Sequence, residues 1–110
     1  MNGKPLRWLH GEVKTPPMSQ DARREIGFLL RELQDGVRLA MPQSRPMPAI
    51  GARCHELRVN DVNKTWRVVY RLDDGAILIL EVFEKKTNQT PPAVIAACRQ
   101  RLQRYEEAQP

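Results

Sequence analysis

Three short runs of predominantly apolar residues lie in the second half of the chain, and polar residues separate them. The runs cover residues 54–59 (CHELRV), 66–72 (WRVVYRL) and 76–87 (AILILEVFEKKT). Each is rich in Val, Ile, Leu and aromatic residues, which suit a pleated strand. Polar residues 60–64 separate the first two runs, and Asp73-Asp74-Gly75 separates the last two. Asp followed by Gly between such runs is typical of a hairpin, because glycine adopts a positive φ without steric cost. We therefore predict an antiparallel meander of three strands.

The pleat of these strands sorts their side chains onto two faces. The last run is apolar throughout residues 76–80, which predicts burial on both faces and hence a central or helix-covered strand. In the other two runs the faces differ, and we expect one face to carry Trp66, Val68, Tyr70, Leu72, His55, Leu57 and Val59, and the other to carry Arg67, Val69, Arg71, Cys54, Glu56 and Arg58. Arg58, Arg67 and Arg71 then share a polar face or rim, and Lys85-Lys86 follow where the last strand ends.

Helical periodicity predicts two helices, one on each side of these runs in the sequence. The first extends from Ser19, a plausible N-cap, toward Asp35, and Gly36 suits the left-handed position that ends a helix. A further short helical turn is expected at 37–41. The second helix covers 93–105 and begins at Pro91-Pro92, because proline is favoured in a first helical turn. The apolar stripes of the two helices are Ala22, Ile26, Leu29, Leu30 and Leu33, and Val94, Ile95, Cys98, Leu102 and Tyr105.

The remaining segments complete a single domain over residues 1–110. Residues 6–10 alternate weakly and could form a first, edge strand. Pro42, Pro46 and Pro48 exclude a helix from the connector before the meander, which we expect to be an extended surface crossover. The order strand, helix, connector, meander, helix predicts an α+β fold: a two-layer domain whose mostly antiparallel sheet has its helices packed on one side.

Charge and composition narrow the functional classes only partly. The formal net charge is +5 and the isoelectric point is about 9.7, which fits either a polyanion partner or a soluble protein that is merely basic. Cys54 and Cys98 are too few for a disulfide framework, so we expect buried reduced thiols. The chain has no apolar run long enough for a membrane span and no signal-peptide pattern, which favours a cytoplasmic protein. Zinc-ligand spacing, a glycine-rich phosphate loop and a serine nucleophile motif are also missing from the sequence.

A combination of motifs between residues 56 and 101 is more specific. A strand ending in ELR is followed by a Trp-Arg-Val-x-Tyr strand, then by a strand ending in Phe-x-Lys-Lys-Thr, and a proline then opens a helix containing Ala and Arg. In this order the motifs resemble the RelE/HigB superfamily of toxins, in particular its phage-derived HigB-like branch. Pro46-Met47-Pro48 with Gly51, and the helix from Ser19 to Asp35, also fit that branch.

The resemblance implies a RelE-like domain with a defined activity. Such toxins enter the ribosomal A site and cut the mRNA there, so the implied protein is a ribosome-dependent mRNA endoribonuclease of a type II toxin–antitoxin system. The ribose 2′-hydroxyl attacks the neighbouring phosphate, and no metal or cofactor is implied. The implied partners are the ribosome, mRNA and a cognate antitoxin, often a HigA-like helix-turn-helix protein, with no membrane.

The resemblance also suggests roles for individual residues. Arg67 would bind the scissile phosphate, Arg58 would join it, and Lys86 would stabilise transition-state charge and could protonate the leaving group. Lys85, Arg71 and Thr87 would bind RNA. Each role has a structural alternative: Arg67 could be ion-paired with Glu56 or Glu81, Lys85-Lys86 could be a charged strand end that limits aggregation, and Arg58 could face an acidic residue across the strands.

The general base is left open. Related toxins place a Tyr or His near the last helix, whereas residues 88–92 read NQTPP here. Tyr105 falls on an apolar stripe and His55 on the apolar face, so both suit structural roles. Glu56 could act as a base, but an ion pair with Arg58 or Arg67 would oppose that role. Two alternatives to the nuclease therefore remain: a catalytically inactive relative that binds RNA or a protein, and a structural domain such as a phage component.

Overall fold

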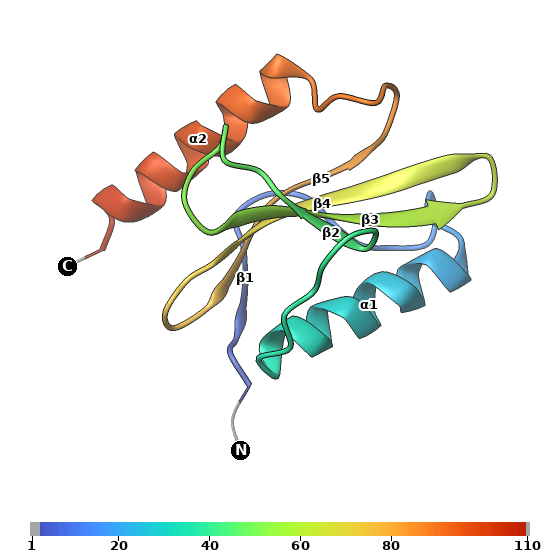
Figure 1. The fold of residues 1–110 in the computed structure, drawn as a ribbon, viewed down its shortest axis with the longest axis horizontal. Helices are drawn as coiled ribbons and strands as arrows, with labels where there is room; N and C mark the ends of the chain where they lie inside the picture. The colour runs from blue at the N-terminus through green and yellow to red at the C-terminus, as the bar shows by residue number, and fades with distance from the viewer. Residues whose placement is uncertain (1–2, 110) are drawn as a thin grey trace.

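A computed structural model describes residues 3–109, which form a five-stranded sheet and two helices (Figure 1). The elements in chain order are β1 (Leu6–Trp8), α1 (Gln20–Gln34), β2 (Ser44–Pro46), β3 (Cys54–Asp61), β4 (Lys64–Leu72), β5 (Ile77–Glu84) and α2 (Pro92–Glu107). The order across the sheet is β1-β5-β4-β3-β2. Only β1 and β5 among these neighbours run parallel, and the other pairs are antiparallel. The predicted α+β class and the three-stranded meander are confirmed.

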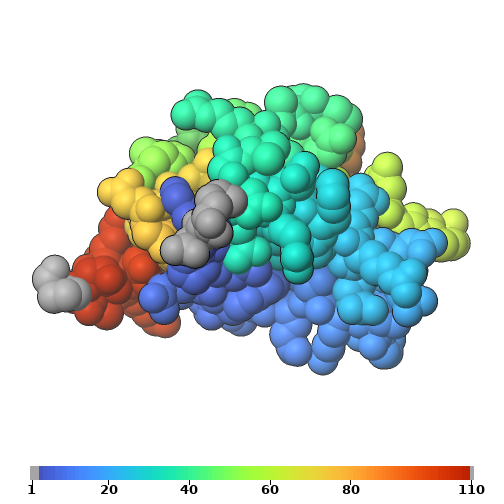
Figure 2. Space-filling view, turned by 90° about the horizontal axis from the view of Figure 1, so that it is seen from below, coloured from blue at the N-terminus to red at the C-terminus, as the bar shows by residue number. Residues whose placement is uncertain are grey.

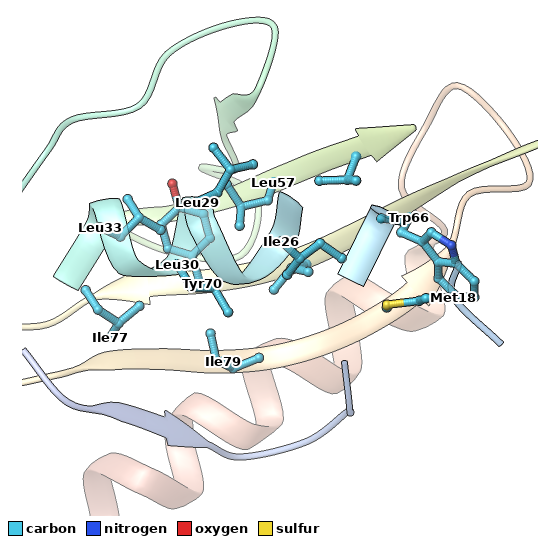
Figure 3. Packing of buried hydrophobic residues seen from close by; sticks show 13 residues of the cluster. Met18, Ile26, Leu29, Leu30, Leu33, Leu57, Trp66, Tyr70, Ile77 and Ile79 are labelled. Atoms are coloured by element: carbon cyan, nitrogen blue, oxygen red, sulfur yellow. The ribbon is translucent and has the colours of Figure 1, made fainter. Parts of the chain in front are cut away.

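The two helices lie on opposite faces of the sheet, which corrects the expectation that they pack on one side (Figure 1). The side chains of α1 pack against Leu57, Val68 and Ile79 among others, and Figure 3 shows this cluster between α1 and the sheet. Cys98 and Leu102 of α2 pack on the other face, against a cluster that includes Val69, Leu78 and Leu80. The reason lies in β5, whose apolar residues point both ways, so each face needs its own cover.

The segment between α1 and β3 also differs from its prediction. Residues 37–40 are not helical, and Ser44–Pro46 forms β2, an edge strand paired with β3. Gly36 has a φ of 88°, as predicted for the end of α1, and turns the chain away from the helix axis. Proline restricts the residue before it to extended conformations and is tolerated on an edge strand. The connector is therefore extended, as expected, but it belongs to the sheet.

Both predicted hairpins are present, although the reason given for one of them is wrong. Asp73 N–H donates to the Ala76 carbonyl at 2.9 Å and closes the β4–β5 loop, yet Gly75 does not have a positive φ. The positive φ occurs instead at Asn63, at 59°, in the β3–β4 turn. Asparagine tolerates this left-handed conformation better than most residues.

Hydrogen bonds attach the start of α1 to the β3–β4 hairpin. Ser19 caps the helix as predicted, since its hydroxyl accepts from Ala22 N–H at 3.0 Å. The backbone N–H of Ser19 and the indole N–H of Trp66 both donate to Asp61 at 2.9 Å. Figure 2 shows α1 lying across its face of the molecule, with the hairpin projecting at one end.

A bulge interrupts the pairing of β4 with β5. Tyr70 lies opposite Ile79 and Val69 lies opposite Glu81, so Leu80 is the extra residue. Leu80 packs in the cluster beneath α2, and Glu81 pairs with Arg101 of α2 at 3.4 Å, so two consecutive residues point to the same face. A bulge of this kind bends the strand and changes its alternation.

Neither helix within residues 3–109 combines the length and apolar character that a membrane crossing requires. Cys54 and Cys98 are both buried and free, as predicted. Burial raises the pKa of the Cys98 thiol to about 12.

Candidate functional site

Cationic side chains from neighbouring strands gather at one end of the sheet, on the face that carries α2. Arg45 comes from β2, Arg58 from β3, Arg67 from β4, and Lys85 directly follows β5. Arg58 lies directly opposite Arg67 in the β3–β4 register. The backbone N–H of Lys85 donates to the Thr65 carbonyl at 2.7 Å. Because Arg67 is paired with Phe83, this bond extends the β4–β5 pairing two residues beyond Phe83. Residues two apart on a strand share a face, so Lys85 points to the side of Arg67. We call these four residues the cationic cluster.

Glu56 is the carboxylate at the centre of the cationic cluster, and its side chain is 0% exposed. It lies beside Arg45, whose Nε donates to Oε1 at 3.2 Å. The Nη1 of Arg67 lies 3.3 Å from Oε1, and the Thr90 hydroxyl donates to Oε2 at 2.9 Å. Both carboxylate oxygens are thus occupied as acceptors. An ion pair this deeply buried needs such additional hydrogen bonds to offset its loss of hydration.

Arg67 faces the predicted side, but its side chain is 0% exposed. Besides Glu56, it donates to the Thr90 hydroxyl and to the Asn88 carbonyl, each at 3.3 Å. Burial lowers the pKa of Arg67, and the charge of Glu56 acts in the opposite direction. A guanidinium nevertheless stays protonated in proteins. The structure therefore has the ion pair with Glu56 that the sequence left as the alternative, and the charge of Arg67 lies under the surface rather than on it.

Arg45, Arg58 and Lys85 are the partly exposed members of the cluster, and Arg58 lies directly opposite Arg67. The residue opposite Arg58 is a second cation, so the alternative of an acidic cross-strand partner is wrong. Partial burial and the charges of Arg58, Arg67 and Arg45 lower the pKa of Lys85, against the weaker opposing effect of Glu56. Placing like charges together in this way is costly, and positive charge exceeds negative charge here.

The other predicted site residues lie outside this arrangement. Lys86 is exposed and its Nζ lies 3.3 Å from Glu84, which is opposite Trp66 on the α1 face. Arg71 is at the far end of the α2 face, where it pairs with Glu106 at 2.8 Å, so the structure does not bring it to the cluster. The exposed Thr87 donates to the Gln89 carbonyl at 2.7 Å within the loop after β5.

Arg45 and Thr90 both contact Glu56, and neither was predicted from the sequence as a site residue. Arg45 lies between prolines in a segment read as a crossover, and its place beside Glu56 depends on the unrecognised strand β2. Thr90 precedes Pro91-Pro92, and it is 8% exposed although its neighbours in the loop are exposed. A signal for Arg45 was available, since Ser-Arg-Pro next to a β-prone run could have been read as an edge strand.

A hollow beside Arg58 includes no other member of the cationic cluster. Arg58 lines a hollow of about 300 Å³ together with Glu25, Pro42, Gln43 and Asn60. This volume is at the lower end of the range for small-molecule sites. Within residues 3–109 no group of three or more His, Cys, Asp and Glu side chains is arranged to hold a metal ion.

His55 and Tyr105 have the structural positions predicted for them. His55 stacks on Tyr70 with a centroid distance of 5.4 Å, and Tyr105 packs beside the cluster beneath α2. Neither belongs to the cationic cluster. A proton acceptor must therefore be sought among other residues.

Comparison with known proteins gives one family. No curated protein matches the chain. The family model described as phage derived protein Gp49-like (DUF891) matches residues 17–103, from the start of α1 almost to the end of α2. The match includes every strand that contributes to the cationic cluster. The chain therefore belongs to the Gp49-like family of phage-derived proteins, a family of toxin-like proteins.

Proposed function

We propose that this protein is the toxin of a type II toxin–antitoxin pair and acts in the cytoplasm as a ribosome-dependent mRNA endoribonuclease. In the proposed reaction, which uses no metal, the ribose 2′-hydroxyl attacks the neighbouring phosphate and the 5′-oxygen leaves. The observation that carries the proposal is the cationic cluster, in which Arg45, Arg58, Arg67 and Lys85 outnumber the single carboxylate of Glu56. Membership of a toxin-like family supports the same reading.

The cluster suits a reaction that builds up negative charge on a phosphate. Arg58 and Arg45 are partly exposed, and we assign them to the scissile phosphate. Arg67 lies beneath them, held by Glu56, Thr90 and the Asn88 carbonyl, and contributes a fixed positive charge. Charges that are already oriented stabilise a transition state without reorganisation during the reaction. We assign Lys86 and Thr87, exposed just beyond the cluster, to the neighbouring RNA backbone.

The antitoxin of this pair would cover the same surface. We propose a helix-turn-helix protein with an acidic and apolar segment that lies over Arg58 and Lys85. Such a segment matches the excess of positive charge and would block entry to the ribosomal A site. Coexpression of this partner should abolish any growth arrest.

Controlled expression in bacteria tests the nuclease directly. The intact chain should arrest growth and produce ribosome-bound mRNA fragments with 5′-hydroxyl ends. Arg58→Ala should lower the cleavage rate by about 100-fold or more, as for removal of a transition-state charge donor. Arg104→Ala, which removes an exposed arginine of α2, is the matched control and should still arrest growth. Full-length mRNA on the ribosomes of cells that contain the intact chain would contradict the proposal.

One observation favours a second candidate function. Because Arg67 is sealed by Glu56 and Thr90, the surface could bind RNA or an acidic protein without cutting RNA. In that case the chain would bind ribosomes, Arg58→Ala would weaken this binding, and the mRNA would remain intact. The same expression experiment separates the two functions.

A further inference from the structure

The proposed cleavage needs a group that removes the proton of the 2′-hydroxyl, and most members of the site cannot do this. The guanidiniums of Arg45, Arg58 and Arg67 stay protonated and offer no acceptor. Glu56 is 0% exposed, and its oxygens already accept from Arg45, Arg67 and Thr90. A ligand on the surface could not reach this carboxylate without opening the buried network.

The histidines of the chain, His10 and His55, lie elsewhere. His55 is on the α1 face, where its Nδ1 lies 3.2 Å from the Arg53 carbonyl and its ring stacks on Tyr70. His10 follows β1, across β5 from the cluster, with its Nε2 3.7 Å from Glu81. Neither histidine has a contact with a member of the cationic cluster among these interactions.

Lys85 is the remaining titratable side chain of the cationic cluster. Its backbone is held by the hydrogen bond to Thr65, and its side chain is partly exposed on the face of Arg67. The groups that act on it come from each strand of the site: Arg45 from β2, Arg58 and Glu56 from β3, and Arg67 from β4. Together with partial burial, the arginines lower the pKa of Lys85, which increases the fraction of neutral amine at a given pH.

We propose that Lys85 is the general base of the cleavage reaction. The proposal rests on the proposed function and replaces the RNA-binding role assigned to Lys85 from the sequence. Lysine shifts its pKa readily in such surroundings and is known as a general base where it does so.

Water is the only additional reactant that this step needs to balance its protons. The neutral Nζ of Lys85 takes the proton of the 2′-hydroxyl, the O2′–P bond forms, and the P–O5′ bond breaks. The leaving 5′-oxygen takes a proton from water, and the resulting hydroxide later takes the proton from Lys85. The products are a 2′,3′-cyclic phosphate and a 5′-hydroxyl. Arg58 and Arg45 hold the phosphate while its charge changes.

Lys85→Arg is the sharpest test, because it keeps the positive charge and removes the titratable amine. Single-turnover cleavage of mRNA on purified ribosomes should slow by about 100-fold or more, the usual contribution of a general base. The affinity for ribosomes should change by less than about threefold, since the charge of the phosphate-binding surface is retained. Lys64→Arg is the matched control: Lys64 is a partly exposed lysine at the same end of the sheet, over the Trp66 ring on the α1 face, and its variant should cleave normally.

The pH profile gives a further readout. Wild-type cleavage should rise with pH through the pKa of Lys85 and then level off, because only the neutral amine accepts a proton. The residual activity of Lys85→Arg should lack this inflection. A Lys85→Arg rate within about threefold of wild type would overturn the assignment while leaving the nuclease intact, because a true base contributes far more. Absence of cleavage by the wild type would instead overturn the nuclease and the assignment together.

A measurement without activity completes the test. In protein labelled with ¹³C at lysine Cε, the Lys85 signal should titrate below the usual pH range of a lysine side chain. Assignment of the Lys85 signal comes from its disappearance in Lys85→Arg. Titration of Lys85 in the usual range would overturn the proposal, whatever the activity of the protein.

Discussion

At the scale of single residues, Glu56 and Arg67 are the unusual feature of this molecule, because both are charged and both are 0% exposed. The pleat predicted from the sequence placed them on the same face correctly. Their burial could not be predicted, because it depends on Thr90 and the Asn88 carbonyl, which return over β4 from a loop distant in sequence. Arg45 contacts the other side of Glu56 from β2, an edge strand that was not predicted. Local pattern thus identified the residues, whereas long-range packing determined their environment.

The buried pair gives a stability prediction. Glu56→Gln leaves the charge of Arg67 uncompensated in the interior and should destabilise the protein by about 3–5 kcal/mol, the usual cost of removing one partner. The double variant Glu56→Leu/Arg67→Met, which removes both charges, should recover a large part of this loss. Urea unfolding of the two variants and the wild type measures the effect. If the single and double variants lost the same free energy of unfolding, the unpaired charge of Arg67 would not be the cause of the destabilisation.

Cysteine reactivity gives a second prediction at this scale. Cys98 is 0% exposed and burial raises its pKa to about 12, so almost no thiolate is present near neutral pH. Because the thiolate is the reactive form, native protein should react with iodoacetamide far more slowly than protein in denaturant. Mass spectrometry of the labelled peptide measures both rates. Rapid labelling of Cys98 in the folded protein would contradict the burial of its side chain between α2 and the sheet.

At the scale of elements, the sequence predicted every helix and strand of the described chain except β2, because a periodic pattern, weak only at β1, marks the others. It misplaced the helices relative to the sheet. The apolar run of β5 contributes side chains to both faces, so α1 and α2 must lie on opposite sides to bury it. The turn 37–41 was also misread, since a short apolar stretch after a helix has no period long enough to distinguish it.

Asp61 joins two of these elements and makes their contact sensitive to acid. Hydrogen bonds from the Ser19 backbone, the Ser19 side chain and the Trp66 indole hold the pKa of Asp61 well below its usual range. A lowered pKa in the folded state means that the contribution to stability is present above the unfolded pKa and is lost as the pH falls below it. Asp61→Asn should therefore lower the melting temperature at neutral pH, and the difference from wild type should shrink below about pH 4.

Thermal unfolding followed by circular dichroism at several pH values checks this expectation. The control is Asp74→Asn, which changes an exposed aspartate in the β4–β5 loop and should give a smaller difference at neutral pH. If the difference in melting temperature between Asp61→Asn and wild type stayed constant or grew in acid, the role assigned to Asp61 would be contradicted.

At the scale of the whole molecule, each face of the sheet is covered by one helix. α1 and its cluster occupy the first face, and α2 packs against the half of the second face that contains Cys54, Val69 and Leu78. The other half carries the cationic cluster, where the loop before α2 covers Arg67 and where Arg45, Arg58 and Lys85 are partly exposed. Part of the excess positive charge of the chain thus has a definite place, which composition alone could not supply.

The position of this charge predicts the salt dependence of binding. Each phosphate contact releases counterions, so affinity for ribosomes should fall as salt rises. Arg58→Ala should reduce the slope of the logarithm of affinity against the logarithm of salt concentration by about 1, as for loss of one phosphate contact. Arg104→Ala, on the outer side of α2, should leave the slope unchanged. Sedimentation with ribosomes at several salt concentrations measures it, and identical slopes for wild type and Arg58→Ala would contradict a phosphate contact at Arg58.

The extra residue at Leu80 has a consequence for the whole cationic end of the sheet. Strict alternation counted from the buried Ile77 would turn Lys86 to the face of Arg67 and Lys85 to the α1 face. With Leu80 inserted, the parity of the strand reverses, and the two neighbouring lysines exchange sides. Deleting Leu80 would restore regular alternation but leave Glu81 opposite Val69 and Lys85 opposite Thr65, so Lys85 would stay on the side of Arg67. With Leu80 present, the bulge therefore determines that Lys85, and not Lys86, shares a face with the arginines.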